Sequence, residues 1–292
     1  MTSPRARQLP PWFRTSLSTS GRFVAVRNRL REGSLRTVCE GAACPNRNEC
    51  WNAGTATFLI LGDRCTRSCR FCNIPSGHPI PVDRKEAQRV AQAAKSLCLD
   101  HVVITSVTRD DLPDGGAGLF AETIHAVRSI MPACTIEVLV PDFQGSREAL
   151  DTVLAAAPDI LNHNIETVPS LYPSVRPQAD FRRSLGVLAQ AVQRGCTAKS
   201  GMMAGLGEDR EKIHETMQEL RKTGCELLTI GQYLQPRRDL WPVARFYHPD
   251  EFRDMEQEGV VLGFTAVQAG PLVRSSYHAA TMNHHRHLQR MS

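Results

Sequence analysis

The 292-residue sequence predicts an α/β protein whose core is a parallel sheet curved into a partial barrel. From about residue 55, short apolar runs alternate with stretches of helical periodicity. Six such strand–helix units predict parallel strands joined by right-handed crossovers. Because six units are too few for a closed eight-fold barrel, we expect an open barrel with its chemistry at the carboxyl ends of the strands.

Each predicted strand is a short apolar run, and the six runs span residues 56–61, 101–105, 135–140, 159–163, 198–203 and 227–230. Between them, apolar residues recur at the spacing of helices with one buried face. The clearest repeats span residues 87–97, 181–192 and 213–220, and the last two are followed by Gly195 and Gly224, where a C-terminal glycine is expected. We therefore predict a barrel over residues 55–264, an N-terminal extension over 1–54 and a C-terminal extension over 265–292.

Composition excludes several classes of protein. Hydrophobic residues make up 41% of the chain and charged residues 22%, a balance typical of soluble globular domains. No apolar run approaches the length of about eighteen residues that a membrane span needs. The net charge of +5 is mild, and after residue 33 basic and acidic residues are interspersed, which argues against nucleic-acid binding.

The first 31 residues carry seven arginines and no acidic residue, a composition that suggests an organellar transit peptide. The segment is short, however, and runs almost directly into the first cysteine motif. We therefore interpret it as part of the folded protein and expect a cytoplasmic, bacterial-type location, with organellar targeting as the alternative.

Ten cysteines are many for a protein without a visible secretory signal, so disulfides are not the expected explanation. Six of them lie between Cys39 and Cys72, and such clustering indicates metal ligation. We expect the remaining four to be small buried residues: Cys98, Cys134, Cys196 and Cys225.

The second cysteine triplet is the more specific: Cys65, Cys69 and Cys72 have the spacing C-x3-C-x2-C, directly after the first predicted strand. Three thiolates on one short loop can bind three irons of a four-iron cluster and leave the fourth without a protein ligand. An open metal position is where substrate chemistry takes place. The alternatives are a zinc site or small core residues. A structural zinc ion needs four ligands, and His78 is the only histidine nearby.

The first triplet is Cys39, Cys44 and Cys50, with the spacing C-x4-C-x5-C. Taken alone, this spacing is a moderate signal for a second metal site. The alternative is a set of loop cysteines that bind no metal.

The second triplet resembles the radical SAM superfamily, because an aromatic residue, Phe71, precedes its last cysteine and the loop follows the first strand of a partial barrel. The resemblance implies a partial (β/α)6 TIM-like barrel of the radical SAM type, with N- and C-terminal extensions. It also implies that the amino and carboxylate groups of S-adenosylmethionine (SAM) chelate the open iron. One electron then cleaves the sulfonium and releases a 5′-deoxyadenosyl radical.

The chain as a whole resembles the lipoyl synthase family over roughly residues 10–280. The resemblance begins with the flanks of the first triplet, TVCE (37–40) and CPN (44–46). It continues through VTRDDL (107–112), DGG (114–116), EVLVPDF (137–143), NHNIET (162–167), KSGMM (199–203), GQYLQP (231–236) and the closing motif RSSYHA (274–279).

This resemblance implies that two sulfur atoms are inserted at C6 and C8 of an octanoyl chain, amide-linked to a lysine of a lipoyl carrier domain, with two SAM molecules used per lipoyl group. The first triplet then binds an auxiliary [4Fe–4S] cluster that is consumed as the sulfur donor, and Ser276 supplies an oxygen ligand to its fourth iron. The implied partners are the octanoylated carrier, a reductant such as ferredoxin or flavodoxin, and a cluster-repair protein, with no nucleic acid and no membrane.

Four polar residues are candidates for SAM binding. Asn164 and Glu166 lie at the end of the fourth predicted strand, and Lys199 and Ser200 belong to the fifth. Polar groups at such positions of a barrel commonly face the site. A carboxylate suits a ribose diol, and an ammonium or hydroxyl suits the methionyl carboxylate. A surface loop is the alternative for each.

Two other functions compete with this interpretation. A radical SAM enzyme resembling biotin synthase would act on dethiobiotin, although the first triplet and the closing motif argue against it. An iron–sulfur electron carrier or a zinc-binding module would not cleave SAM to 5′-deoxyadenosine.

Overall fold

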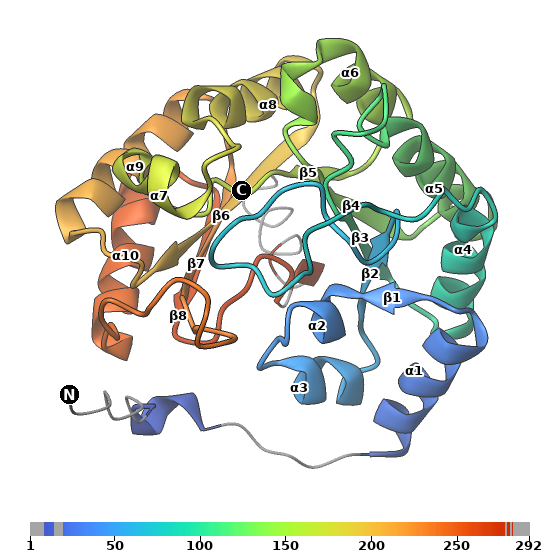
Figure 1. The fold of residues 1–292 in the computed structure, drawn as a ribbon, viewed down its shortest axis with the longest axis horizontal. Helices are drawn as coiled ribbons and strands as arrows, with labels where there is room; N and C mark the ends of the chain where they lie inside the picture. The colour runs from blue at the N-terminus through green and yellow to red at the C-terminus, as the bar shows by residue number, and fades with distance from the viewer. Residues whose placement is uncertain (1–8, 15–19, 278, 281, 283–292) are drawn as a thin grey trace.

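The computed structural model describes residues 9–14, 20–277, 279, 280 and 282. Its centre is an eight-stranded sheet with the strands in sequence order (Figure 1). The strands are β1 (Arg36–Thr37), β2 (Thr57–Ile60), β3 (His101–Ser106), β4 (Thr135–Leu139), β5 (Ile160–Asn162), β6 (Thr197–Ala204), β7 (Leu227–Gln232) and β8 (Ala266–Gly270). β1 pairs antiparallel with β2, and every later pair is parallel. The predicted α/β partial barrel is confirmed.

The helices of the repeating units surround the outer face of the curved sheet (Figure 1). These are α4 (Glu86–Ser96), α5 (Ala117–Ile130), α6 (Arg147–Ala155), α8 (Phe181–Gln193), α9 (Arg210–Lys222) and α10 (Pro249–Val261). The N-terminal part contributes η1 (Pro11–Phe13), α1 (Gly21–Glu32), α2 (Val38–Gly41) and α3 (Arg47–Asn52). The short elements η2 (Phe143–Gly145), η3 (Pro169–Leu171) and α7 (Tyr172–Val175) lie in loops.

All six predicted strands are present, whereas β1 and β8 were not predicted. β1 has only two residues, and β8 is partly exposed along its whole length, so neither carries a buried apolar run. β8 pairs with β7 just beyond residue 264, where the sequence places the start of the C-terminal extension. That division of the chain stays a prediction.

Capping residues fix both ends of two predicted helices, α8 and α9. Asp180 accepts a hydrogen bond from the backbone of Arg183 and caps α8, and Asp209 caps α9 in the same way through Lys212. Gly195 follows α8 with φ 76°, and Gly224 follows α9 with φ 86°. These left-handed positions explain why glycine ends both helices.

The four single cysteines differ in burial. Cys134 and Cys225 are buried and Cys196 is half-buried, but Cys98 is exposed. The prediction of a buried residue is therefore wrong for Cys98. This residue lies in the turn after α4 with φ 52°, where the chain reverses at the surface before β3.

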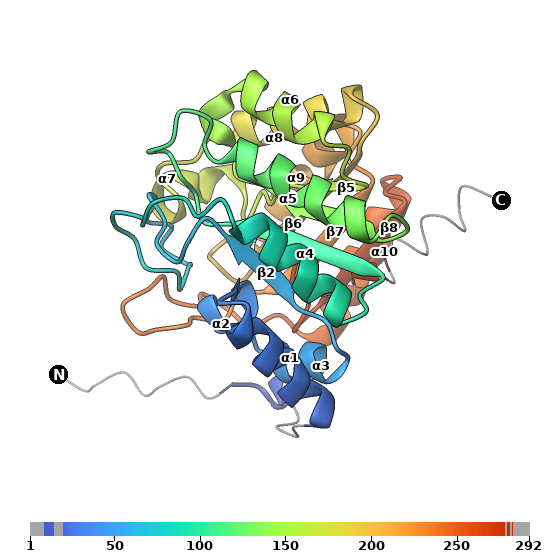
Figure 2. The same cartoon turned by 90° about the vertical axis from the view of Figure 1, so that its right-hand side faces the viewer.

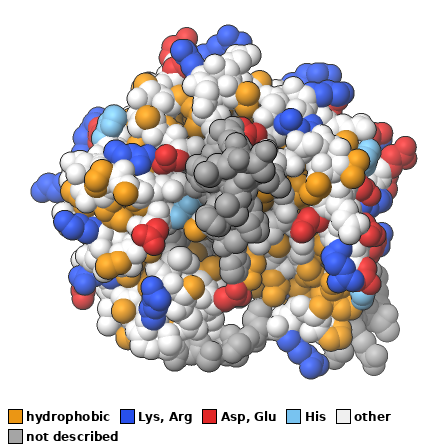
Figure 3. Space-filling view, turned by 180° about the vertical axis from the view of Figure 1, so that it is seen from behind, with side chains coloured by type: hydrophobic (Ala, Val, Ile, Leu, Met, Phe, Trp, Pro, Cys, Tyr) orange, Lys and Arg blue, Asp and Glu red, His pale blue; other side chains and the backbone are white. Residues whose placement is uncertain are grey.

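The two ends of the barrel differ. The carboxyl ends of the strands carry long loops, which lie on the left of Figure 2. At the amino ends, Met282 packs against Ile160 and Leu227, the first residues of β5 and β7. On that face, basic and acidic side chains are interspersed (Figure 3). None of the described helices is long and apolar enough to span a membrane.

Candidate functional site

The second cysteine triplet lies in residues 61–85, between β2 and α4, a segment that we call the cysteine loop. The loop folds back on itself because the backbone N–H of Cys65 donates to Pro75 at 2.9 Å and Gly77 donates to Cys65 at 3.0 Å. At its tip, Cys72 donates to the carbonyl of Cys69 at 3.0 Å. Because the loop follows β2 directly, it lies at the carboxyl end of the barrel (Figure 2), where the site was expected.

The three thiols of this loop lie close together. Burial is the main cause that raises the pKa of Cys69 to about 11 and that of Cys72 to about 12, and the charge on Cys65 contributes to both. The backbone N–H groups of Arg67 and Ile74 point at the sulfurs of Cys65 and Cys72 respectively, both at 3.4 Å. Such hydrogen bonds suit thiolates that bind a metal centre, because metal coordination deprotonates the thiols.

The first triplet also comes together, although it spans two helices. Cys39 lies in α2, Cys50 lies in α3, and the backbone N–H of Cys44 between them donates to the carbonyl of Cys39 at 3.1 Å. Burial is the main cause that raises the pKa of Cys50 to about 12, and the charges on Cys39 and Cys44 contribute to the rise.

Within the part of the chain that the structure describes, no three histidine, cysteine, aspartate or glutamate side chains are arranged to hold one metal ion. A four-iron cluster uses a different arrangement, in which each cysteine binds its own iron.

The closing motif packs on the first triplet. The side-chain amide of Asn46 donates to the carbonyl of Leu272 at 2.6 Å, and the hydroxyl of Tyr277 donates to Glu49 at 2.8 Å. Between these contacts, the hydroxyl of Ser276 accepts a hydrogen bond from Thr57 at 2.9 Å. Ser276 therefore lies beside the segment that carries Cys39, Cys44 and Cys50, while His278 of the motif falls outside the described residues.

The two cysteine triplets are neighbours in space. The side-chain amide of Asn73, which follows Cys72, donates to the carbonyl of Gly41 in the first triplet at 2.9 Å. A Cβ atom added to Gly41 would lie 2.7 Å from the terminal methyl of Ile74, so the two segments are in close contact. The fold thus brings both triplets to one end of the barrel.

Asn164 and Glu166 form a half-buried polar pair after β5. The amide of Asn164 donates to the Glu166 carboxylate at 3.3 Å, and the Asn164 carbonyl oxygen is buried without a partner in the structure. Burial raises the pKa of Glu166, whose backbone has φ 67° and is bonded to β6. A strained acidic residue beside an unsatisfied buried oxygen is typical of a ligand site.

Lys199 and Ser200 have protein partners instead. The hydroxyl of Ser200 donates to the carbonyl of His163 at 2.9 Å and accepts from the backbone of Ile165 at 3.2 Å. The ammonium of Lys199 donates to both carboxylate oxygens of Glu137, at 2.9 and 3.1 Å, and both side chains are fully buried. Their assignment as SAM contacts stays a prediction.

Sequence reasoning missed Arg176. Its buried guanidinium donates to the carbonyls of Asn164 at 3.2 Å and Ile165 at 2.8 Å. The guanidinium charge also counteracts part of the rise that burial causes in the pKa values of Cys69 and Glu166. The backbone N–H of Arg70 in the cysteine loop donates to the carbonyl of Val175 at 2.8 Å, so Arg176 lies between the polar pair and that loop. Arg176 follows α7 in a segment without a recognisable motif, so only the folded chain reveals its contacts.

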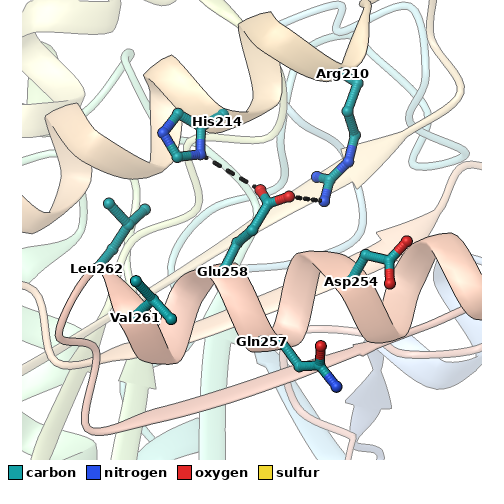
Figure 4. A pocket seen from close by; sticks show the side chains of 7 residues that line it. All are labelled: Arg210, His214, Asp254, Gln257, Glu258, Val261 and Leu262. Carbon is teal, nitrogen blue, oxygen red and sulfur yellow. Dashed lines mark hydrogen bonds and ion pairs between the residues drawn. The ribbon is translucent and has the colours of Figure 1, made fainter.

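A surface pocket lies between α9 and α10, on the outside of the barrel (Figure 4). Glu258 at its centre forms ion pairs with Arg210 at 2.6 Å and with His214 at 3.4 Å. None of the predicted site residues lines this pocket. It is therefore separate from the candidate site.

Comparison with known proteins identifies the family. Residues 59–220 match the radical SAM superfamily. The chain is 53% identical to the lipoyl synthase of Rubrobacter xylanophilus, over 92% of this chain and 85% of that protein. It is 51% identical to the lipoyl synthase of Chlorobium limicola, over 98% of this chain and 99% of that protein.

Solved structures of distantly similar proteins share the fold. SuiB of Streptococcus suis bound to S-adenosylmethionine has a TM-score of 0.55 at 11% identity, over 73% of this chain and 50% of that one. HydG, a maturase of the [FeFe]-hydrogenase, has a TM-score of 0.54 at 12% identity, over 85% and 67% of the two chains. Since half of its residues match lipoyl synthases from end to end, this chain belongs to the lipoyl synthase family of the radical SAM superfamily.

Proposed function

We propose that this chain inserts two sulfur atoms, at C6 and C8, into an octanoyl chain that is amide-linked to a lysine of a lipoyl carrier domain. The observation that carries the proposal is the contact between the two cysteine triplets, formed by Asn73 and Gly41 at 2.9 Å. A reaction that generates a substrate radical at one centre and takes sulfur from another needs the two centres on the same side of the barrel. The identity to lipoyl synthases over nearly the whole chain supports the same conclusion.

The cysteine loop would hold a [4Fe–4S] cluster through Cys65, Cys69 and Cys72, with SAM on the open iron. Asn164 and Glu166 would bind the ribose of SAM, because the unpartnered carbonyl oxygen and the carboxylate offer acceptors for a diol. Lys199 and Ser200 remain candidates for its carboxylate. When bound, cluster and SAM supply a radical strong enough to remove hydrogen from an unactivated methylene group.

The first triplet would hold the auxiliary [4Fe–4S] cluster that donates sulfur. Cys39, Cys44 and Cys50 provide three ligands, and Ser276 provides the fourth. The packing of the closing motif on this segment supports Ser276, since Thr57 holds its hydroxyl at 2.9 Å. An oxygen ligand is exchangeable, which suits a cluster that must release iron and sulfide.

No acid or base removes an unactivated methylene hydrogen. The protein's side chains therefore contribute by positioning the substrate and by excluding water. The loop between β7 and α10 lies against the cysteine loop, where the backbone N–H of Trp241 donates to Arg70 at 2.7 Å. Its indole N–H donates to Leu206 at 2.7 Å. Trp241 and Phe71 both pack against an apolar cluster of Val175, Leu206 and Tyr233, which screens this end of the barrel.

The proposal includes partners and a location. The octanoylated carrier domain must stay outside while its acyl chain enters the barrel, and a reductant such as ferredoxin or flavodoxin must supply electrons to the cysteine loop. A protein that rebuilds the auxiliary cluster is a further candidate partner. The cytoplasm of a bacterial cell is the expected location, in keeping with the lipoyl synthases that the chain resembles.

The decisive experiment incubates the anaerobically reconstituted protein with SAM, dithionite and an octanoyl-lysyl peptide, followed by mass spectrometry of the peptide. We expect two added sulfur atoms and two molecules of 5′-deoxyadenosine per product. Release of 5′-deoxyadenosine without sulfur insertion would leave the radical SAM assignment intact and overturn the substrate. Sulfur insertion into dethiobiotin in a parallel assay would favour a biotin synthase-like activity instead.

A further inference from the structure

Arg67 lies inside the second triplet, between Cys65 and Cys69, and its side chain is only 5% exposed. Its guanidinium donates to both carboxylate oxygens of Asp110, at 2.6 and 2.9 Å. The same group donates to Asp142 at 2.6 Å. Because Asp110 follows β3 and Asp142 follows β4, one side chain joins the loops after three consecutive strands.

The backbone of Arg67 is held as firmly as its side chain. Its carbonyl accepts a hydrogen bond from the hydroxyl of Ser76 at 2.9 Å, and its N–H points at the sulfur of Cys65 at 3.4 Å. The neighbouring residue Thr66 accepts from the backbone N–H of Asp110 at 3.0 Å. The ion pairs of Arg67 therefore fix the position of an N–H group that contacts a cysteine ligand.

The positive and negative charges in the ion-pair network of Arg67 are equal in number. Asp142 also pairs with Arg183 at 3.2 Å, so two guanidinium groups face two carboxylates beside the cysteine loop. Removing one member leaves an uncompensated charge near the cluster. Removal of an arginine leaves excess negative charge, and removal of a carboxylate leaves excess positive charge.

We propose that Arg67 is a positioning residue that holds the cysteine loop in its cluster-binding shape and sets the reduction potential of the cluster bound there. The proposal rests on the proposed function of this loop. A loop that is already ordered loses less conformational entropy when it binds a metal centre. Hydrogen bonds to the ligand sulfurs and the surrounding charge determine the potential of an iron–sulfur cluster.

The first test is the reduction potential of the reconstituted full-length protein with SAM bound, followed by electron paramagnetic resonance, since SAM alters the signal of the cluster that it binds. We expect Arg67→Met to lower the potential, because the Cys65 contact is loosened, Asp110 loses its ion pair and Asp142 keeps only its ion pair with Arg183. We expect Asp142→Asn to raise it. Both variants loosen the loop, so shifts of the same sign, or no shift, would overturn the electrostatic role.

The matched control is Arg128→Gln. Arg128 pairs with Asp159 at 2.6 Å and donates to the carbonyl of Cys134 at 2.7 Å, but it lies at the amino ends of β4 and β5. Its loss removes a comparable set of bonds far from the cysteine loop. The potential of this variant should equal that of the unmodified protein, and a shift as large as that of Arg67→Met would overturn the proposal.

The second test needs no cluster. Hydrogen exchange of the cluster-free protein should show amides of residues 65–77 exchanging at least about tenfold faster in Arg67→Met, while the rest of the barrel is unchanged. Equal exchange in variant and unmodified protein would overturn the positioning role. Failure of the unmodified protein to bind a cluster would instead refute the proposed function, and the exchange result would still decide the role of Arg67.

Discussion

The hydroxyl of Thr57 donates a hydrogen bond to the hydroxyl of Ser276, 2.9 Å away. Thr57 begins β2, the first parallel strand, whereas Ser276 lies in the closing motif near the other end of the chain. Each hydroxyl can donate or accept, so Thr57 is able to donate to the Ser276 oxygen when that oxygen binds iron as an alkoxide. Burial raises the pKa of Cys39, and the backbone of Thr57 counteracts part of that rise. Thr57 thus adjoins two proposed ligands of the auxiliary cluster.

Replacing Thr57 with valine keeps the shape of the side chain and removes the hydrogen bond to Ser276. A bond of this kind contributes about 1 kcal/mol, so we expect roughly fivefold less lipoyl product per SAM cleaved. SAM cleavage itself should be unchanged, because the cysteine loop is untouched. The measurement is the ratio of lipoyl peptide to 5′-deoxyadenosine by mass spectrometry.

Thr105→Val is the matched control for Thr57→Val. Thr105 lies on β3, is also buried, and donates its hydroxyl hydrogen to the carbonyl of Leu139 at 2.9 Å. This variant should lose stability to a similar degree and keep the normal ratio of products. A normal ratio in Thr57→Val as well would show that the bond to Ser276 has no part in sulfur transfer.

Ser276→Cys exchanges the proposed oxygen ligand for a thiolate, which binds iron more strongly and is released less readily. We expect the auxiliary cluster to assemble with a normal iron content and Mössbauer signature, while sulfur insertion is abolished. SAM should still be cleaved. A fully active Ser276→Cys variant would refute the assignment of Ser276 as an iron ligand.

The strands and helices of the barrel could be predicted from sequence because each carries its own signal. The run 101–105 is almost entirely buried in β3, and the repeat 181–192 became α8 with its cap Asp180 and its C-terminal Gly195. β8 could not be predicted in this way. Its residues are small or polar and half-exposed, and it forms because β7 offers an unpaired edge.

The candidate site was predictable where a motif is local and not where contacts join distant segments. The spacing of Cys65, Cys69 and Cys72 within one short loop is by itself enough to indicate a cluster. The ion pairs of Arg67 depend on carboxylates that follow two other strands, and Arg176 contacts backbone carbonyls that offer no side-chain pattern. Only the fold brings these groups together.

Glu166→Gln should weaken SAM binding, because it removes the carboxylate proposed to accept hydrogen bonds from the ribose. Hydrogen bonds to charged groups contribute about 1.5–3 kcal/mol, so we expect a tenfold to hundredfold higher Kd. The measurement is equilibrium dialysis of SAM against protein with an intact cluster. As a control, Glu122→Gln removes an exposed ion pair with Arg84 and should leave the Kd unchanged. An unchanged Kd in Glu166→Gln would remove this residue from the site.

The variant Lys199→Met distinguishes between two roles of Lys199, as the ion-pair partner of Glu137 and as a ligand of the SAM carboxylate. If the ammonium serves Glu137, its loss leaves a fully buried carboxylate with Asn162 and His101 as its remaining partners and should lower the free energy of unfolding by about 3–5 kcal/mol. The double variant Lys199→Met/Glu137→Leu should then recover most of that stability, as measured by urea unfolding. If the ammonium binds the SAM carboxylate instead, the single variant will retain its stability and lose affinity for SAM.

His163 makes the stability of the barrel depend on pH. Burial lowers the pKa of its ring to about 4 in the folded protein, while Nδ1 lies 2.9 Å from the carbonyl of Val140. The unfolded chain, with a pKa near about 6.5, therefore binds the proton more tightly, so stability is lost as the pH falls from 6.5 towards 4.

Between pH 7 and pH 5, the titration of His163 should cost the protein on the order of 2 kcal/mol, and His163→Gln should lack this loss. Urea unfolding of both proteins without clusters, at each pH, measures the difference directly and avoids acid loss of iron. The carboxylates affect both proteins equally, so they cancel in the comparison. Parallel pH dependence in the two proteins would mean that His163 accepts the proton without cost, through a partner that stabilises the imidazolium.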